Sequence, residues 1–118
     1  LGTVNTTASG GNNFVALNGA GASITSSNAN IIIGSSAGAA LTSGSGLNIL
    51  VGSNAGNDLV TAEQNVMIGR NAGQRADYGI ANVLIGESAG EYIIGSVGNP
   101  LTVGADNVLI GSDAGVQR

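Results

Sequence analysis

The chain of 118 residues contains no cysteine, no histidine and no lysine, and a single proline. Without cysteine or histidine it cannot build a disulfide framework, a thiolate metal site, or a Ser-His or Cys-His nucleophile. Charged residues make up 8% and the net charge is −4, so the basic stripe that would neutralise nucleic-acid phosphates is missing. Apolar runs of about three or four residues are too short to cross a bilayer. We therefore expect no enzymatic activity, no cofactor or metal, no nucleic-acid partner and no membrane insertion.

Carboxylates are the remaining groups for acid–base catalysis, which in glycosidases needs two of them across a sugar site. Most occupy variable positions of the repeat described below, where solvated loop charges are the simpler interpretation. They are Asp58, Glu63, Asp77, Glu87, Glu91, Asp106 and Asp113. The glycine-rich spacing of a calcium-binding β-roll is absent. The sequence leaves open that a groove between chains brings two carboxylates together.

Glycine, in contrast, is abundant at 21 residues and recurs in the phrase Asn-Φ-Φ-Φ-Gly-x-x-Ala-Gly, where Φ is a large aliphatic residue or Met. Copies start at Asn13 (a degenerate one), Asn30, Asn48, Asn65, Asn82 and Asn107, at a nearly constant spacing until the last interval. Such self-similarity is typical of stacked repeat proteins. We predict an all-β fold, a β-solenoid or β-helix of about six rungs of 17–18 residues, in a single repeat domain over residues 1–118. Because the chain starts at Leu1 without Met, we expect it to be a fragment of a longer polypeptide.

Each copy predicts one short strand followed by tight corners. The three apolar residues between Asn and Gly are rich in β-branched side chains, which favour extended backbone over helix. The glycine after the strand predicts a corner, the Ala-Gly pair predicts a second one, and the asparagine predicts a third. Stacked in every rung, the asparagines would also form a ladder along the column. The predicted structural corners are Gly34, Gly52, Gly69, Gly86, Gly111, Asn30, Asn48, Asn65, Asn82 and Asn107.

The three apolar positions, here called slots one to three, fall on two faces because side chains alternate along a strand. Slots one and three are β-branched in all five clear copies, whereas slot two is mostly longer and unbranched at Cβ. We assign slots one and three to the interior of the coil and slot two to an outward stripe. An apolar stripe of this size is typical of an interface. The predicted oligomer interface is therefore Ile32, Leu50, Met67, Leu84 and Leu109.

The spacing Asn-x-x-Ile-Gly-x-x-Ala-Gly, which recurs from Asn30 to Gly115, resembles the short repeats of bacteriophage tail fibres and related virion appendages. The resemblance implies a homotrimeric fibre of intertwined or packed chains, acting as a shaft or host-contact module in a virion or extracellular setting. The repeat is also similar to the heads of trimeric autotransporter adhesins, with one residue fewer between Asn and Gly and a longer rung. The hexad from Ile33 to Gly38 resembles those of left-handed β-helix acyltransferases, but these enzymes use a histidine as general base.

The last interval breaks the rhythm of the repeat. The segment between Gly90 and Asn107 is about twice as long as the segments that separate the other clear copies. Insertions in solenoids map to loops and often to the binding face, so we predict an insertion loop over 91–106 that contacts a host surface glycan or protein. The candidate contact residues are Tyr92, Ile94, Asn99 and Pro100.

Two other functions suit a solenoid of this composition. The head or stalk of a bacterial trimeric surface adhesin is the main alternative to a viral fibre. Ice binding is a minor alternative and would need a regular array of threonines. Thr25, Thr42 and Thr61 recur near one rung position, but the next rung has no counterpart between Arg75 and Ile80.

Overall fold

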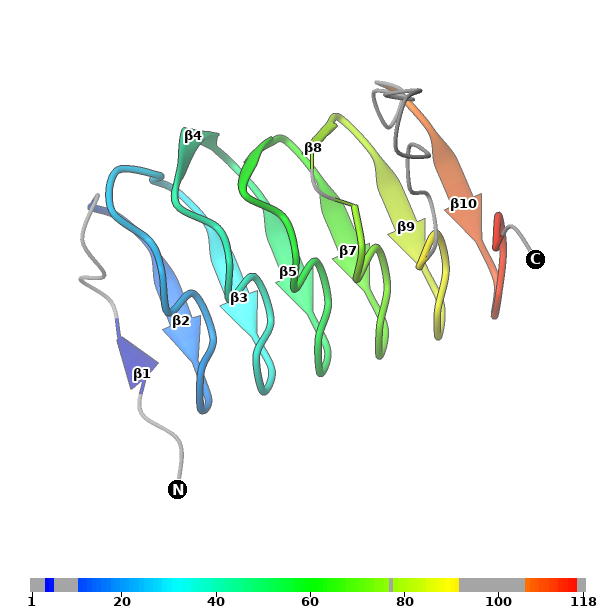
Figure 1. Ribbon diagram of the computed structural model, residues 1–118, viewed down its shortest axis with the longest axis horizontal. Helices are drawn as coiled ribbons and strands as arrows, with labels where there is room; N and C mark the ends of the chain where they lie inside the picture. Colours follow the sequence, from blue (N-terminus) through cyan, green and yellow to red (C-terminus); the bar gives the residue numbers. More distant parts are fainter. Residues whose placement is uncertain (1–3, 6–10, 77, 92–105, 117–118) are drawn as a thin grey trace.

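The computed structural model describes residues 4–5, 11–76, 78–91 and 106–116. Within these ranges every regular element is a β-strand and no helix occurs. Successive turns of the chain stack side by side along the longest axis of the molecule (Figure 1). The predicted all-β solenoid is confirmed: its strands pair in parallel between turns, and the coil has about four turns.

A long sheet runs along the column, and the Φ-Φ-Φ segments are its strands. Six of them pair in parallel and in register, so the middle residue of each strand lies opposite the middle residue of the next. In spatial order they are β2 (Phe14–Ala16), β3 (Ile31–Ile33), β5 (Ile49–Val51), β7 (Val66–Ile68), β9 (Val83–Ile85) and β10 (Val108–Ile110). The short β1 (Val4–Asn5) pairs antiparallel with β2 and completes this seven-stranded sheet.

A second, shorter sheet lies on the other part of the turns. Its parallel strands are β4 (Ser43–Gly46), β6 (Thr61–Glu63) and β8 (Tyr78–Ile80). The turn that starts at Asn30 is one residue longer than the turn that starts at Asn48. The extra residue lies in β4, where the register shifts between Ser43 and Gly46. A bulge in the shorter sheet thus absorbs the irregular spacing and leaves the long sheet in register.

Four complete turns start at Asn13, Asn30, Asn48 and Asn65, and within them only Asp77 lies outside the described residues. Strand β10 continues the long sheet on β9. The path of the chain between Glu91 and Asp106 is not among the described residues. Of the six rungs expected, the structure therefore gives the six parallel strands of the long sheet but not six complete turns.

The core of the column is a row of slot-two side chains. Ile32, Leu50, Met67 and Leu84 are 0% exposed, and Leu109 in the last strand is partly buried against the same cluster. Fully buried alanines and leucines from the rest of the turn complete the cluster: Ala37, Ala55, Ala72, Ala89, Leu41 and Leu59. The structure therefore reverses the orientation predicted for the strand. Slot two points into the coil and forms no outward stripe, so these five residues cannot be the oligomer interface.

The asparagine of each repeat explains this orientation. It lies two residues before slot two, and side chains two apart on a strand share a face. Asn48 and Asn65 are 0% exposed, so slot two must also face inward, and slots one and three must face outward. The interior has little room around these long side chains. A Cβ added to Gly38 would lie 2.8 Å from Leu50 Cδ1, and one on Gly73 would lie 2.5 Å from Met67 Sδ.

Candidate functional site

A ladder of asparagine side chains runs through the inside of the column. The side-chain amide of each asparagine donates to Oδ1 of the asparagine in the preceding turn over 2.9–3.2 Å, and its backbone N–H donates to the same oxygen over 3.0–3.2 Å. The members are Asn13, Asn30, Asn48, Asn65, Asn82 and Asn107. The predicted ladder is confirmed. It fixes the register of the stack because each turn must present its asparagine at the same point.

The amides of the ladder are also tied to their own turns. Asn48 Nδ2 donates to the carbonyl of Ala62 at 3.0 Å, and Asn65 Nδ2 donates to the carbonyl of Gly79 at 2.7 Å. In the part of the chain that the structure describes, no buried side-chain polar atom lacks a hydrogen-bond partner. A buried amide without partners would be destabilising, so the paired ladder is compatible with an otherwise apolar core.

The glycine that follows β3, β5, β7, β9 and β10 allows the turns to stack closely, whereas β2 is followed by Leu17 with a φ of 81°. Gly34, Gly52, Gly69 and Gly86 have φ between 132° and 138°. A Cβ at these four positions would lie 2.3–2.5 Å from the carbonyl oxygen of the equivalent glycine in the next turn. Gly111 has a similar φ of 129°, but its nearest atom would be Ala114 Cβ at 3.9 Å. Conformation and clearance therefore both require glycine in the stacked turns, whereas conformation alone requires it at Gly111.

The corner expected at each asparagine lies one residue earlier. None of the six ladder asparagines has a positive φ. The preceding residues do, with φ of 50–71°, and they are Asn12, Ala29, Leu47, Gln64, Ala81 and Asp106. The asparagine, whose amide is fixed in the ladder, directly precedes the strand, and the residue before it adopts the left-handed conformation. These predecessors are chemically diverse, so composition gave no signal for the corner.

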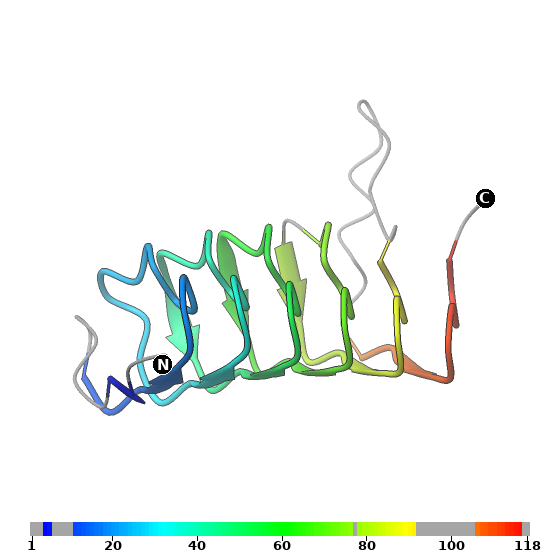
Figure 2. The ribbon, with the colours of Figure 1, turned by 90° about the horizontal axis from the view of Figure 1, so that it is seen from below.

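The outward slots form one continuous apolar surface, which we call the outer face and regard as the candidate functional surface. Figure 2 shows the strands of the long sheet along one flat side of the column. Phe14 and Ile31 are each 42% exposed, and Val108 and Ile110 in the last strand are 65% and 67% exposed. The outer face consists of Phe14, Ala16, Ile31, Ile33, Ile49, Val51, Val66, Ile68, Val83, Ile85, Val108 and Ile110.

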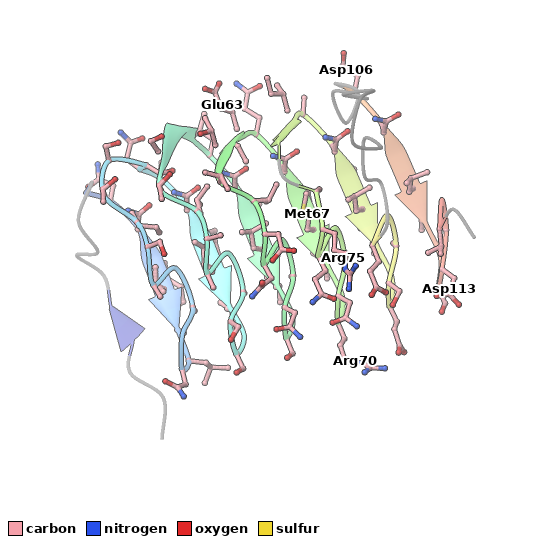
Figure 3. All side chains as sticks on the ribbon, viewed as in Figure 1. Glu63, Met67, Arg70, Arg75, Asp106 and Asp113 are labelled. Carbon is pink, nitrogen blue, oxygen red and sulfur yellow. The ribbon has the colours of Figure 1, made fainter. Side chains whose placement is uncertain are left out.

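Charged side chains lie toward both ends of the strands in Figure 3. Glu63, the last residue of β6 in the shorter sheet, and Asp106, two residues before β10, are at one end, and Arg70 and Asp113, which follow strands of the long sheet, are at the other. Arg70 Nη2 forms an exposed ion pair with Glu87 Oε1 of the next turn. Among the described residues, no three acidic side chains are placed to hold a metal ion.

The remaining predicted site residues fall into two groups. Asp58 and Glu91 lie in the turns that follow the Ala-Gly pair. Asp77 lies outside the described residues, and so do all four residues proposed for the contact loop: Tyr92, Ile94, Asn99 and Pro100.

The threonines considered for ice binding form only a short row. The hydroxyl of Thr25 donates to the carbonyl of Thr42 at 2.9 Å, and that of Thr42 donates to the carbonyl of Val60 at 3.1 Å. Val60 takes the next place in the row, while Thr61 begins β6 one residue later. These two hydroxyls therefore stabilise the stacking of the turns, and the row ends after two threonines.

Comparison with known proteins adds no relative to this description. The chain matches no protein-family model, no curated protein and no solved structure. In the described ranges no helix is long and apolar enough to span a bilayer. Functional inference therefore depends on the geometry of the column and on its outer face.

Proposed function

We propose that this chain is a structural segment of an extracellular fibre or spike, a shaft or host-contact module of a bacteriophage or other virion. The observation that carries the proposal is the ladder that runs from Asn13 to Asn107. It links each turn to the next through side chains, in addition to the backbone hydrogen bonds of the sheets. A repeat stacked in this way is a stiff column whose length grows with the number of turns, which suits a fibre.

The distribution of reactive groups supports a structural role over a catalytic one. Most described carboxylates occupy the edges of the column, and Glu87 is engaged with Arg70. The serines have no histidine beside them, because the chain contains none. A nucleophile without a neighbouring base is weak, so acyl or glycosyl transfer by this segment is not proposed.

The proposed fibre contains several copies of this chain, with three favoured by the resemblance to tail-fibre repeats. The segment 91–106 is the proposed site of contact with a host surface glycan or protein. Its length supports this, since the chain between Gly90 and Asn107 is about twice as long as the other connections between clear copies.

A head or stalk segment of a bacterial trimeric surface adhesin is the second candidate, because the same stacked column would serve there. Ice binding is not proposed. It requires a regular threonine array, and the row that begins at Thr25 and Thr42 continues with Val60.

Immunogold electron microscopy distinguishes these settings. Antibodies against the purified chain are applied to virus particles and to cells of the source that encodes it. Label on particle appendages is expected. Label on the cell envelope without particles would support the adhesin instead, and label confined to the cell interior would contradict both. Antibody absorbed beforehand with the purified chain serves as the control.

A further inference from the structure

The two faces of the long sheet are both apolar, although among the described residues only the inner one is covered by the chain itself. Slot two is buried in the coil, whereas Ile31 and Ile68 on the outer face are 42% and 37% exposed. The outer face contains no polar or charged side chain among its twelve residues. Sheets with one face in water usually carry polar residues there, and a sheet apolar on both faces is typically covered on both.

Polar residues border the outer face along one edge. The position after the corner glycine is Ser35, Ser53, Arg70, Glu87 or Ser112 in successive turns. On the other edge, the residue before the ladder asparagine is Ala29, Leu47, Gln64, Ala81 or Asp106 in successive turns, and Leu47 is 53% exposed. An apolar centre with a partly polar rim is the usual anatomy of a protein–protein interface.

The size of the outer face fits association with another protein. A three-residue strand is about 10 Å long, and six strands about 4.8 Å apart make a flat apolar area of roughly 300 Å². With one flanking residue on each side the footprint is roughly 500 Å², so that two partners would bury about 1,000 Å² in total. This is near the lower limit for a specific interface and exceeds what isolated surface aliphatics provide.

We propose that copies of this chain associate through the outer face, with the β-branched rows of one copy packed on those of its neighbour. A second copy is the occupant because its outer face has the same spacing between turns and can match this surface turn by turn. The absence of charge on the outer face leaves nothing to select an acidic or basic partner. This inference rests on the proposed role as a segment of a multi-chain fibre, and it places the interface on slots one and three.

The test uses a pair of substitutions designed to preserve the folded column. Val66 lies opposite Val83 in the register of β7 and β9. In the double variant V66K/V83E the introduced charges would face each other on a half-buried sheet face, in the same two turns as the exposed pair Arg70 and Glu87. Buried between two copies, the same charges would lose their hydration. The matched control, S35K/S53E, places the same two charges on the polar border in adjacent turns.

Light scattering on the purified chain gives the mass, and circular dichroism reports the fold. The parent and the control are expected at a multiple of 11.4 kDa, and the outer-face variant at 11.4 kDa with a parent-like spectrum. If the outer-face variant does not fold, V66T/V83T replaces it, because threonine keeps β-branching. That variant should raise the dissociation constant about tenfold or more.

Three outcomes would overturn the inference. They are a parent that stays at 11.4 kDa at millimolar concentration, an outer-face variant that keeps the parent mass, and a control that dissociates like the outer-face variant. Immunogold labelling of virion appendages together with a single-chain parent would separate the two proposals. The fibre role would then stand, and association through the outer face would fail.

Discussion

Each turn has two halves: the first runs from the asparagine to the Ala-Gly pair, and the second follows that pair. The two halves differ in how strictly the backbone of one turn must match the backbone of the next. In the first half, the strands β2, β3, β5, β7, β9 and β10 are equal in length and stay in register. In the second half, the described residues form fewer strands, the sequences of these strands vary, and β4 contains a register shift. The long connection over 91–106 also falls in the second half.

The contacts between turns account for this difference. In the first half, the asparagine amide, the slot-two side chain and the corner glycine each contact the equivalent group in a neighbouring turn. A Cβ added to one of the four stacked corner glycines would lie within 2.5 Å of the carbonyl oxygen of the next corner glycine. In the second half, the inward leucines such as Leu41 and Leu59 are fully buried, but the backbone around them can bulge. Irregular length is therefore tolerated where stacking does not depend on one fixed backbone position.

The largest difference in stability between the two halves is expected when one residue is inserted into each half in turn. An alanine inserted between Val66 and Met67 would move alanine into the inner slot and Met67 to the outer face, because register shifts reverse the faces of a strand. We expect a loss of about 2–5 kcal/mol, as for a buried Met→Ala change. A glycine inserted after Ala62 would instead reproduce the longer turn that starts at Asn30 and should cost about 1 kcal/mol or less.

Urea denaturation followed by circular dichroism measures both insertions. Equal losses of stability in the two variants would contradict the difference between the halves.

Removal of one ladder member is expected to have the next largest effect. Asn65→Ala removes the acceptor for the backbone N–H and side-chain amide of Asn82, and it also removes the donor to Gly79. Leaving buried polar groups unpaired should cost about 2–4 kcal/mol. Asn107→Ala is the control, since Asn107 is half-buried in the last described strand pair and should cost less than half as much. The free energies of unfolding from urea titrations give the comparison, and equal costs would show that the ladder does not stabilise the interior.

Two corner glycines allow the cost of backbone strain to be measured apart from the cost of a steric clash with the next turn. In Gly69→Ala the alanine must adopt a φ of 137°, and its Cβ would lie 2.3 Å from the carbonyl oxygen of the next corner glycine. In Gly111→Ala the alanine must adopt a φ of 129°, but its Cβ has no such close contact. We expect Gly69→Ala to cost about 1–3 kcal/mol more than Gly111→Ala. Thermal unfolding of the two variants at equal concentration measures the difference. Melting temperatures within error of each other would mean that the turns move apart without cost.

The smallest effect is expected at the rim of the long sheet. Arg70 and Glu87 pair across two turns, but both side chains are more than half exposed. A double-mutant cycle with Arg70→Ala and Glu87→Ala should give a coupling of about 0–1 kcal/mol that decreases with added salt. A coupling that is larger and insensitive to salt would place this pair in a buried interface.

Sequence reasoning identified the repeat, the short strands, the corner glycines and the asparagine ladder, because each has a local cause. Glycine tolerates the positive φ found after five of the six parallel strands, β-branched residues favour strands, and stacked asparagines can pair their amides. It did not identify the left-handed residues before each asparagine, such as Ala29 and Leu47, because ordinary side chains occupy that position.

A stack of strands with a fixed spacing follows from the amino-acid sequence alone, because the repeated pattern recurs at nearly equal intervals. Which face of each strand lies inside the coil became clear from the folded structure. A three-residue apolar strand has the same pattern in either orientation, and β-branched slots suit either face. The buried side chains of Asn48 and Asn65 fix the orientation, because they share a face with slot two. Inside the coil their amides must be hydrogen-bonded, and the ladder provides these partners. That choice moved the candidate interface from Leu50 and Leu84 to the outer face.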